Sequence, residues 1–251
     1  MSSEQNKAYF NNEAASYDSK HEKTLNQLME ELRSRLDFIG VDWAEEDHDD
    51  LETSARRPVR LLDYACGTGL VSRSLAPYTT QCVGVDLSEN MVAAYNARAE
   101  NQGLLKDEMH AYQGNLCDPS DPSPAAFTSP DFFNFDIAAV GLGFHHFDDP
   151  ALAARRLAER LRTGGVLLIL DFLPHDKMHT AHPATDTVTK HGFSEDEIKQ
   201  LYETAGAAEG FALQSVGVVF SRINKTTGTE GGTETVTTLK RTVFIARGTK
   251  G

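Results

Sequence analysis

Cysteine is scarce in this sequence, and long apolar runs are absent. The three cysteines, Cys66, Cys82 and Cys117, form no Cys-x-x-Cys pair, which is typical of a reducing compartment. No apolar stretch approaches the ~20 residues that a membrane-spanning helix needs. The first ten residues contain neither a basic stretch nor an apolar one, so we expect no secretory leader. We therefore expect a cytoplasmic location, with the nucleus as a second compartment.

Positive charge is in deficit, because 24 lysines and arginines face 37 acidic residues and the net charge is −13. Residues 42–52 hold seven acids and no Lys or Arg. This segment carries −7 of the −13, so the other 240 residues carry −6. The balance argues against nucleic acid or an anionic membrane as the main partner. The acidic segment is either a solvated linker or a docking site for a basic protein partner.

Short apolar runs alternate with helical patterns from residue 59 onward. Strands are predicted at 59–63, 81–86, 109–113, 135–140 and 166–171. Helices are predicted at 70–76, 88–101, 150–162 and 194–205, the last opened by a capping box. Two more strands, at 214–224 and 238–246, enclose a long mobile loop. This alternation predicts an α/β fold with a parallel sheet covered on both faces.

The N-terminal residues have a different pattern. Residues 4–20 predict one or two short helices, and residues 21–39 predict an amphipathic helix that Gly40 can end. The acidic segment follows, as far as Pro58.

The segment LLDYACGTGL at 61–70 carries the clearest chemical signal. A strand that ends in Asp63 is followed by a glycine turn that opens a helix. Gly67 and Gly69 allow the backbone to approach a ligand closely, and the helix N-terminus offers N–H groups to an anion. Twenty-three residues after Asp63, the next strand ends in Asp86. A carboxylate at that position can accept both hydroxyls of a ribose.

The pattern around these glycines narrows the choice of nucleotide. Ser72 stands where the dinucleotide fingerprint has its third glycine, and no P-loop motif occurs. Asp63, four residues before the first glycine, suits a ligand with an ammonium group and would repel a pyrophosphate. A carboxylate, an ammonium group and a ribose together describe S-adenosylmethionine, whose demethylated product is S-adenosylhomocysteine.

An ordered set of motifs, LLDYACGTG, VGVDLSENM, GLGFHHF and LRTGG, lies within residues 59–250. This set resembles the class I S-adenosylmethionine-dependent methyltransferases, and within them the UbiE/Coq5-like group of small-molecule methyltransferases. The resemblance implies a Rossmann-like seven-stranded, mostly parallel sheet with an antiparallel terminal strand and helices on both faces. It divides the chain into a helical lid with the acidic linker, 1–57, and a methyltransferase domain that binds S-adenosylmethionine, 58–251.

The resemblance also implies a set of cofactor-binding residues. They are Tyr17, Asp63, Ala65, Cys66, Gly67, Gly69, Asp86, Leu87, Met91, Asn115, Leu116 and Gly141. Asp63 and the turn at 65–69 would hold the methionine moiety, with Gly141 near it. Asp86 would bind the ribose, and Tyr17 would close over the cofactor.

The remaining residues of the set would hold the adenine. Leu87 and Met91 would cover the ring, while Asn115 and Leu116 would contact its edge. Asn115 stands where many members of the family have Asp.

Methyl transfer is an in-line displacement, so the enzyme mainly aligns two reactants and excludes water. A general base is needed only for an acceptor that arrives protonated. His145, His146 and Asp171 are the candidates, because they follow strands at the edge where open α/β sheets bind ligands. The dense histidines at 175–191 match no zinc spacing, so we expect no metal.

The methyl acceptor is predicted to be a small organic molecule. No DPPY or NPPY motif follows the strand at 135–140, which argues against methylation of nucleic-acid bases. Two alternatives stay open: a protein methyltransferase that docks a basic partner on residues 42–52, and a non-catalytic subunit that binds S-adenosylmethionine.

Overall fold

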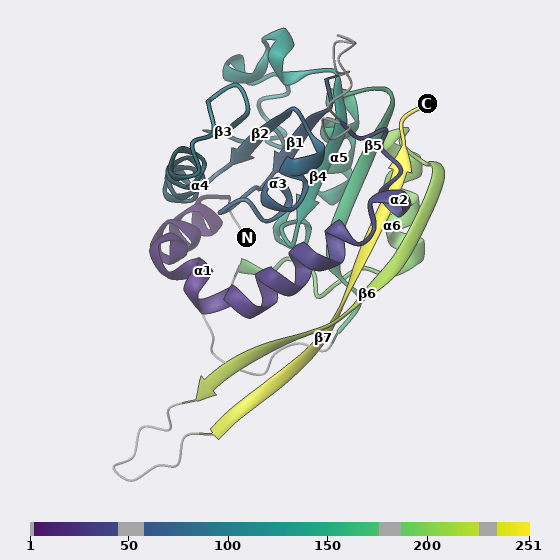
Figure 1. Cartoon of the computed structure of the whole chain (residues 1–251). Helices are drawn as coiled ribbons and strands as arrows, with labels where there is room; N and C mark the ends of the chain where they lie inside the picture. Colours follow the sequence, from purple (N-terminus) through teal and green to yellow (C-terminus); the bar gives the residue numbers. More distant parts are fainter. Residues whose placement is uncertain (1–2, 45–57, 176–186, 226–234) are drawn as a thin grey trace, which may run out of the picture.

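A computed structural model describes residues 3–44, 58–175, 187–225 and 235–251. Seven strands form one sheet in the order β3-β2-β1-β4-β5-β7-β6 (Figure 1). The strands are β1 (Arg60–Tyr64), β2 (Gln81–Asp86), β3 (Met109–Gln113), β4 (Phe135–Gly141), β5 (Leu161–Phe172), β6 (Glu209–Lys225) and β7 (Thr235–Thr249). Strand β7 is antiparallel to both of its neighbours, whereas β1 to β5 pair in parallel. The predicted fold class is confirmed.

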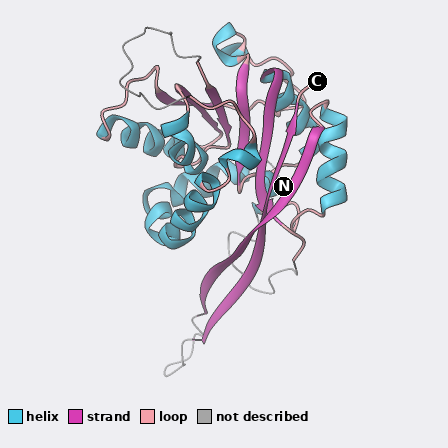
Figure 2. Cartoon of the chain, turned by 45° about the vertical axis from the view of Figure 1, so that its right-hand side comes forward, coloured by secondary structure: helices cyan, strands magenta, loops and turns pink. Residues whose placement is uncertain are grey.

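Helices cover both faces of the sheet because both faces are apolar (Figure 2). Along β1, Leu61 contributes to one core and Leu62 to the other, as the alternation of side chains requires. Helices α3 (Leu70–Leu75) and α4 (Glu89–Asn101) cover the first core, and α5 (Pro150–Arg160) and α6 (Glu195–Ala205) cover the second. The short helical turns are η1 (Ala76–Tyr78), η2 (Ala125–Phe127), η3 (Pro130–Phe132) and η4 (Phe144–His146).

The N-terminal residues form one long helix, α1 (Ser3–Arg33), followed by α2 (Leu36–Ile39). The prediction of one or two short helices over 4–20 was therefore wrong. Residues 3–33 contain neither proline nor glycine, so neither of these helix-breaking residues interrupts α1. The second half of α1 packs on the first core through Leu25, Leu28, Met29 and Leu32. Gly40 ends α2 in the left-handed conformation, as predicted.

Two boundaries differ from the predictions. Helix α5 ends at Arg160, and residues from Leu161 onward belong to β5, whose first residue pairs with Phe135. The hairpin is longer than predicted, because β7 begins at Thr235, three residues before the predicted strand. Strands β6 and β7 extend beyond β5 as a two-stranded arm (Figure 2).

Two predicted features lie largely outside the residues that the structure describes. The acidic segment overlaps residues 45–57 and the hairpin loop includes 226–234, which both lie outside the described residues. Of the helices in the described part of the chain, none combines the length and the apolar character of a membrane span.

Candidate functional site

A cavity of about 250 Å³ lies at the carboxyl ends of the parallel strands. Its wall comes from the turn after β1, from the residues that follow β2, β3 and β4, and from the first half of α1. This is the edge at which open α/β sheets bind ligands. The lining therefore combines segments that lie far apart in the sequence.

The turn after β1 brings the backbone to the cavity. Ala65, Gly67 and Gly69 all have a positive φ, of 53°, 51° and 92°. A Cβ at Gly67 would meet no atom within 4 Å, so glycine leaves free space at the cavity wall there. Gly69 does not line the cavity, and a Cβ there would lie 3.0 Å from the Tyr95 ring. Gly69 therefore serves the packing of α3 on α4.

Asp86 connects this turn to the start of α4. Its Oδ2 accepts the Gly67 N–H at 2.8 Å, and its Oδ1 accepts the Ser88 N–H at 2.8 Å. Burial raises the pKa of Asp86, and the backbone donors oppose that rise. Each carboxylate oxygen can accept a further hydrogen bond. Asp86 can thus hold the turn and accept ligand hydroxyls at the same time.

Asp63 is placed differently from the prediction. It is buried and does not line the cavity. Its Oδ2 accepts the backbone N–H of Ser72 at 2.9 Å and the Ser72 hydroxyl at 2.7 Å. Burial raises its pKa to about 7. In this geometry Asp63 holds the first turns of α3 through Oδ2, and its contact with a methionine moiety stays a prediction.

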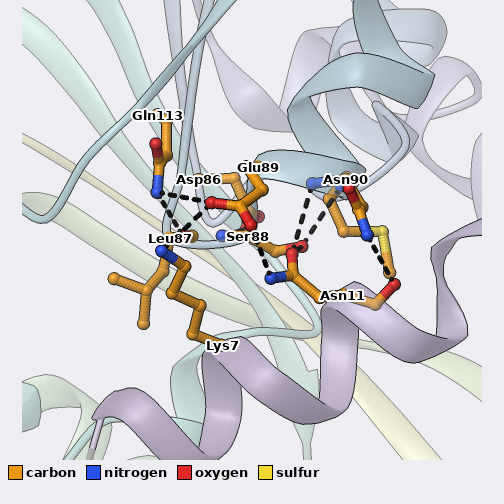
Figure 3. Close-up of polar contacts among 9 residues, drawn as sticks. Lys7, Asn11, Asp86, Leu87, Ser88, Glu89, Asn90 and Gln113 are labelled. Atoms are coloured by element: carbon orange, nitrogen blue, oxygen red, sulfur yellow. Dashed lines mark hydrogen bonds and ion pairs between the residues drawn. The ribbon is translucent and has the colours of Figure 1, made fainter.

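Helix α1 is tied to the start of α4 by a polar cluster (Figure 3). Asn11 Oδ1 accepts the Ser88 hydroxyl at 2.6 Å, and the Asn90 side-chain amide donates to the Asn11 carbonyl at 3.0 Å. Lys7 forms an ion pair with Glu89 at 3.1 Å. Because Ser88 also caps α4, the cluster fixes α1 to the element that follows Asp86.

A second contact ties α1 to the glycine turn. Asp18 Oδ1 accepts the Thr68 hydroxyl at 2.5 Å, and its other oxygen pairs with Arg98. Arg98 also donates to the Thr68 carbonyl at 2.9 Å. The neighbouring Tyr17 lines the cavity, and burial raises its pKa to about 12, so its hydroxyl stays protonated.

His146 is the member of the predicted catalytic set that reaches the cavity. Its Nδ1 lies 2.7 Å from the Thr187 carbonyl oxygen. Because a carbonyl only accepts, Nδ1 carries the proton and Nε2 keeps its lone pair. Burial, with His145 beside it, lowers the pKa of His146 to about 3. The imidazole is therefore neutral at physiological pH.

His145 and Asp171 lie behind the cavity wall. The His145 Nδ1 lies 2.8 Å from Asp171 Oδ1, and the His145 N–H donates to Asp171 Oδ2 at 3.0 Å. Neither residue lines the cavity, so the predicted direct catalytic role has no geometric support. The pair instead holds η4 against β5 and sets the position of His146.

The predicted site residues thus fall into two groups, those that line the cavity and those that do not. The cavity wall contains Tyr17, Ala65, Cys66, Gly67, Asp86, Leu87, Met91, Asn115, Gly141 and His146. Asp63, Gly69, Leu116, His145 and Asp171 are not part of it. Burial raises the pKa of Cys66 well above 9, so this thiol is no nucleophile. Within the described ranges, no group of His, Cys, Asp and Glu side chains could hold a metal ion.

Sequence reasoning missed Asn6, Asn11, Asp18 and Tyr64. The first three lie on α1 and contact residues 50 to 140 positions away. Glycine spacing and strand ends carry no signal for such contacts. Tyr64 is the last residue of β1, directly before the glycine turn. Its hydroxyl donates to Asn115, a contact that cannot be inferred without knowing where Asn115 lies in the fold.

Comparison with known families and sequences gives a consistent result. A family model described as a methyltransferase domain matches residues 16–208. The chain is similar to an uncharacterized methyltransferase of Schizosaccharomyces pombe, with 31% identity over 151 residues, 58% of this chain and 52% of that protein. A ubiquinone biosynthesis O-methyltransferase of Ruegeria pomeroyi is 30% identical over 53% of this chain and 49% of its own length. The chain spans about half the length of the curated relatives it matches.

Solved structures share the fold. The YcgJ protein of Bacillus subtilis superposes with a TM-score of 0.58 at 17% identity, covering 88% of this chain and 98% of its own. A chain from the complex between the Haloferax volcanii Trm112 methyltransferase activator and a methyltransferase superposes with a TM-score of 0.62 at 18% identity, covering 96% of both chains. At these identities the likeness concerns the arrangement of the elements.

Proposed function

The chain belongs to the methyltransferase family, with the fold of the class I, UbiE-like enzymes, and we propose that it transfers a methyl group from S-adenosylmethionine to a small organic acceptor. The observation that carries this proposal is the Asp86–Gly67 contact at the wall of a cavity that α1 covers. A carboxylate that accepts ribose hydroxyls beside an open glycine backbone is the arrangement that a nucleoside ligand needs.

The residues around the cavity fit this cofactor. Asp86 would hold the ribose, Leu87 and Met91 would cover the adenine, and the turn at 65–67 would hold the methionine end; all of these residues line the cavity. When bound, S-adenosylmethionine would supply a methyl group carried on a sulfonium sulfur. This sulfur is the leaving group and becomes a thioether. The chain itself aligns the acceptor and excludes water, and α1 provides the cover.

His146 supplies the one neutral imidazole at the cavity wall within the described ranges. Its Nε2 accepts the O–H or N–H of the methyl acceptor and so directs that atom's lone pair toward the methyl group. With a pKa of about 3, the imidazole is a weak base and passes the acceptor's proton to water. His145 and Asp171 act through His146 as positioning residues.

The names of similar proteins support a small acceptor. Besides the Ruegeria enzyme, a demethylmenaquinone methyltransferase of Thermus thermophilus is 32% identical over 49% of this chain and 51% of its own length. A ring of the quinone type is the acceptor class that these names suggest. Cytoplasmic location and the boundary of the lid at residue 57 stay predictions.

Transfer of a labelled methyl group tests the proposal. The full chain is incubated with methyl-tritiated S-adenosylmethionine and an extract of its source cells, which is then separated into proteins and small molecules. We expect the label among the small molecules. Label confined to protein would contradict the proposed acceptor and support the protein methyltransferase, and no label in either fraction would support the non-catalytic subunit.

A further inference from the structure

Arg241 lies on β7 at the carboxyl edge of the parallel strands, the edge that carries the cavity. Strand β7 is antiparallel to β5, and Val243 pairs with Phe172, the last residue of β5. The Thr242 carbonyl accepts the Leu173 N–H at 2.9 Å, and Arg241 is the next residue outward along β7. The pairing therefore sets a charged side chain beside the carboxyl end of β5.

The hydrogen bonds of Arg241 differ from those of two arginines in similar surroundings. The guanidinium carbons of Arg60, Arg160 and Arg241 lie 4.6, 4.3 and 5.0 Å from the centroid of a phenylalanine ring. Arg60 also donates to the Gln81 side chain at 2.7 Å, and Arg160 to the Phe127 carbonyl at 2.6 Å. Arg241 is half-buried, and no described residue accepts a hydrogen bond from it. Its five N–H donors are therefore available to a ligand.

Asp171 balances the charge of Arg241 without satisfying these donors. The carboxylate attracts the guanidinium and so opposes the fall of the Arg241 pKa that burial causes. Its Oδ1 lies 2.8 Å from the His145 ring nitrogen and accepts the Phe172 N–H at 2.7 Å, and its Oδ2 accepts the His145 N–H at 3.0 Å. An anion bound to Arg241 would leave a net negative charge beside the buried Asp171. The missing partner is therefore an oxygen that accepts hydrogen bonds and brings no charge.

A series of ring contacts joins Arg241 to the cavity wall. The Phe172 ring beneath the guanidinium lies 5.2 Å from the His145 ring, which in turn lies 4.1 Å from the His146 ring. The positive charge of Arg241 is also among the causes that lower the pKa of His146. Arg241 itself is not part of the cavity wall, whereas His146 is. A molecule that reaches His146 from the β5 side, with the cofactor in the cavity, therefore passes the guanidinium.

We infer that Arg241 belongs to the acceptor site and binds an uncharged carbonyl oxygen of the methyl acceptor, while the atom to be methylated lies at His146. This inference rests on the proposed function. It describes an acceptor with two different ends, an O–H or N–H that His146 accepts and a carbonyl that accepts from Arg241. The Phe172 ring holds the guanidinium in place by a cation–π contact. In an acceptor of the quinone type, this carbonyl is a ring ketone.

The dependence of methyl transfer on the acceptor concentration tests the role of Arg241. The small-molecule fraction of the source-cell extract, serially diluted, is the acceptor, and methyl-tritiated S-adenosylmethionine is the donor. We expect Arg241→Leu to need about tenfold more of this fraction for half-maximal transfer, because a hydrogen bond from a charged donor is lost. Its affinity for S-adenosylhomocysteine, measured by calorimetry, should equal that of the wild-type chain. Arg155→Leu is the matched control, because Arg155 is exposed on α5 and should keep the wild-type half-saturation.

Arg241→Gln separates hydrogen bonding from charge, because an amide keeps N–H donors and loses the charge. We expect its half-saturation to lie between those of the wild-type chain and Arg241→Leu. Two results would overturn the inference: wild-type half-saturation in Arg241→Leu, or equal half-saturation in Arg241→Leu and Arg241→Gln, which would leave Arg241 only the task of balancing Asp171.

The labelled product of the wild-type chain supplies an arm that needs no variant, so misfolding cannot obscure it. We expect this product to pass through an anion exchanger, because it is uncharged, and to be captured by a hydrazide resin, which binds ketones. Retention on the exchanger would identify an acidic acceptor, and passage through the hydrazide resin an acceptor without a ketone; either result would overturn the inference. Absence of label from the small-molecule fraction would instead contradict the proposed function.

Discussion

Two carboxylates at the ends of adjacent strands have different tasks. Asp86 lines the cavity and accepts one backbone N–H on each oxygen, whereas Asp63 is enclosed and serves Ser72 alone. The sequence places both at strand ends beside glycines, so their roles look alike from the pattern. Burial separates them, because only a carboxylate with lone pairs directed to the cavity can bind a ligand.

Replacing Asp86 by alanine should weaken the binding of S-adenosylhomocysteine by about 1.5–3 kcal/mol, because charge-assisted hydrogen bonds to the ribose are lost. The affinity of Asp86→Asn should lie between those of the wild-type chain and Asp86→Ala, since an amide keeps one acceptor. Calorimetry measures the difference. An affinity equal to that of the wild-type chain would show that Asp86 does not bind the ribose.

Asp63 should give the fold a pH dependence. Its folded pKa of about 7 lies above the ordinary 3.8, so the folded state holds the proton more tightly than the unfolded state. This contribution is fully present below about pH 4 and is lost as the pH rises through about 7. Urea unfolding between pH 4.5 and 7.5 should show a steeper decline in the free energy of unfolding for the wild-type chain than for Asp63→Asn. The same curves for the exposed control Asp107→Asn should parallel the wild type; parallel curves for Asp63→Asn would refute the assignment.

At the scale of elements, the strands, α4 and the second half of α1 were predictable from the sequence, and the first half of α1 was not. Apolar runs such as 166–171 are buried on both faces, and Ser88 caps α4 as its position predicts. The first half of α1 has few buried apolar side chains, so its helical period is weak in the sequence. Its place depends instead on Asn11 and Asp18, whose partners lie 50 or more residues away.

Deleting residues 1–20 should therefore weaken cofactor binding while leaving the rest of the chain folded. The deletion removes the Asn11 and Asp18 contacts and Tyr17, while Leu25 to Leu32 remain in the core. We expect the free energy of unfolding to fall by less than about 3 kcal/mol and S-adenosylhomocysteine to bind at least about tenfold more weakly. Asp18→Asn is the milder companion, since it keeps the helix and weakens its contact with Arg98. Wild-type affinity in both variants would contradict a role of α1 in cofactor binding.

At the scale of the whole molecule, the excess of acids is concentrated in one short segment, residues 42–52. A protein acceptor that docked there would bind by charge attraction, which salt screens over about 8 Å at physiological ionic strength. A neutral small acceptor would reach the cavity without that attraction. We therefore expect turnover with the small-molecule fraction to change less than about twofold between 50 and 300 mM salt. Replacing the acids at 45–50 by their amides should leave this turnover unchanged. A steep loss of methyl transfer with salt, abolished by the same amides, would instead identify the segment as the docking site of a basic protein substrate.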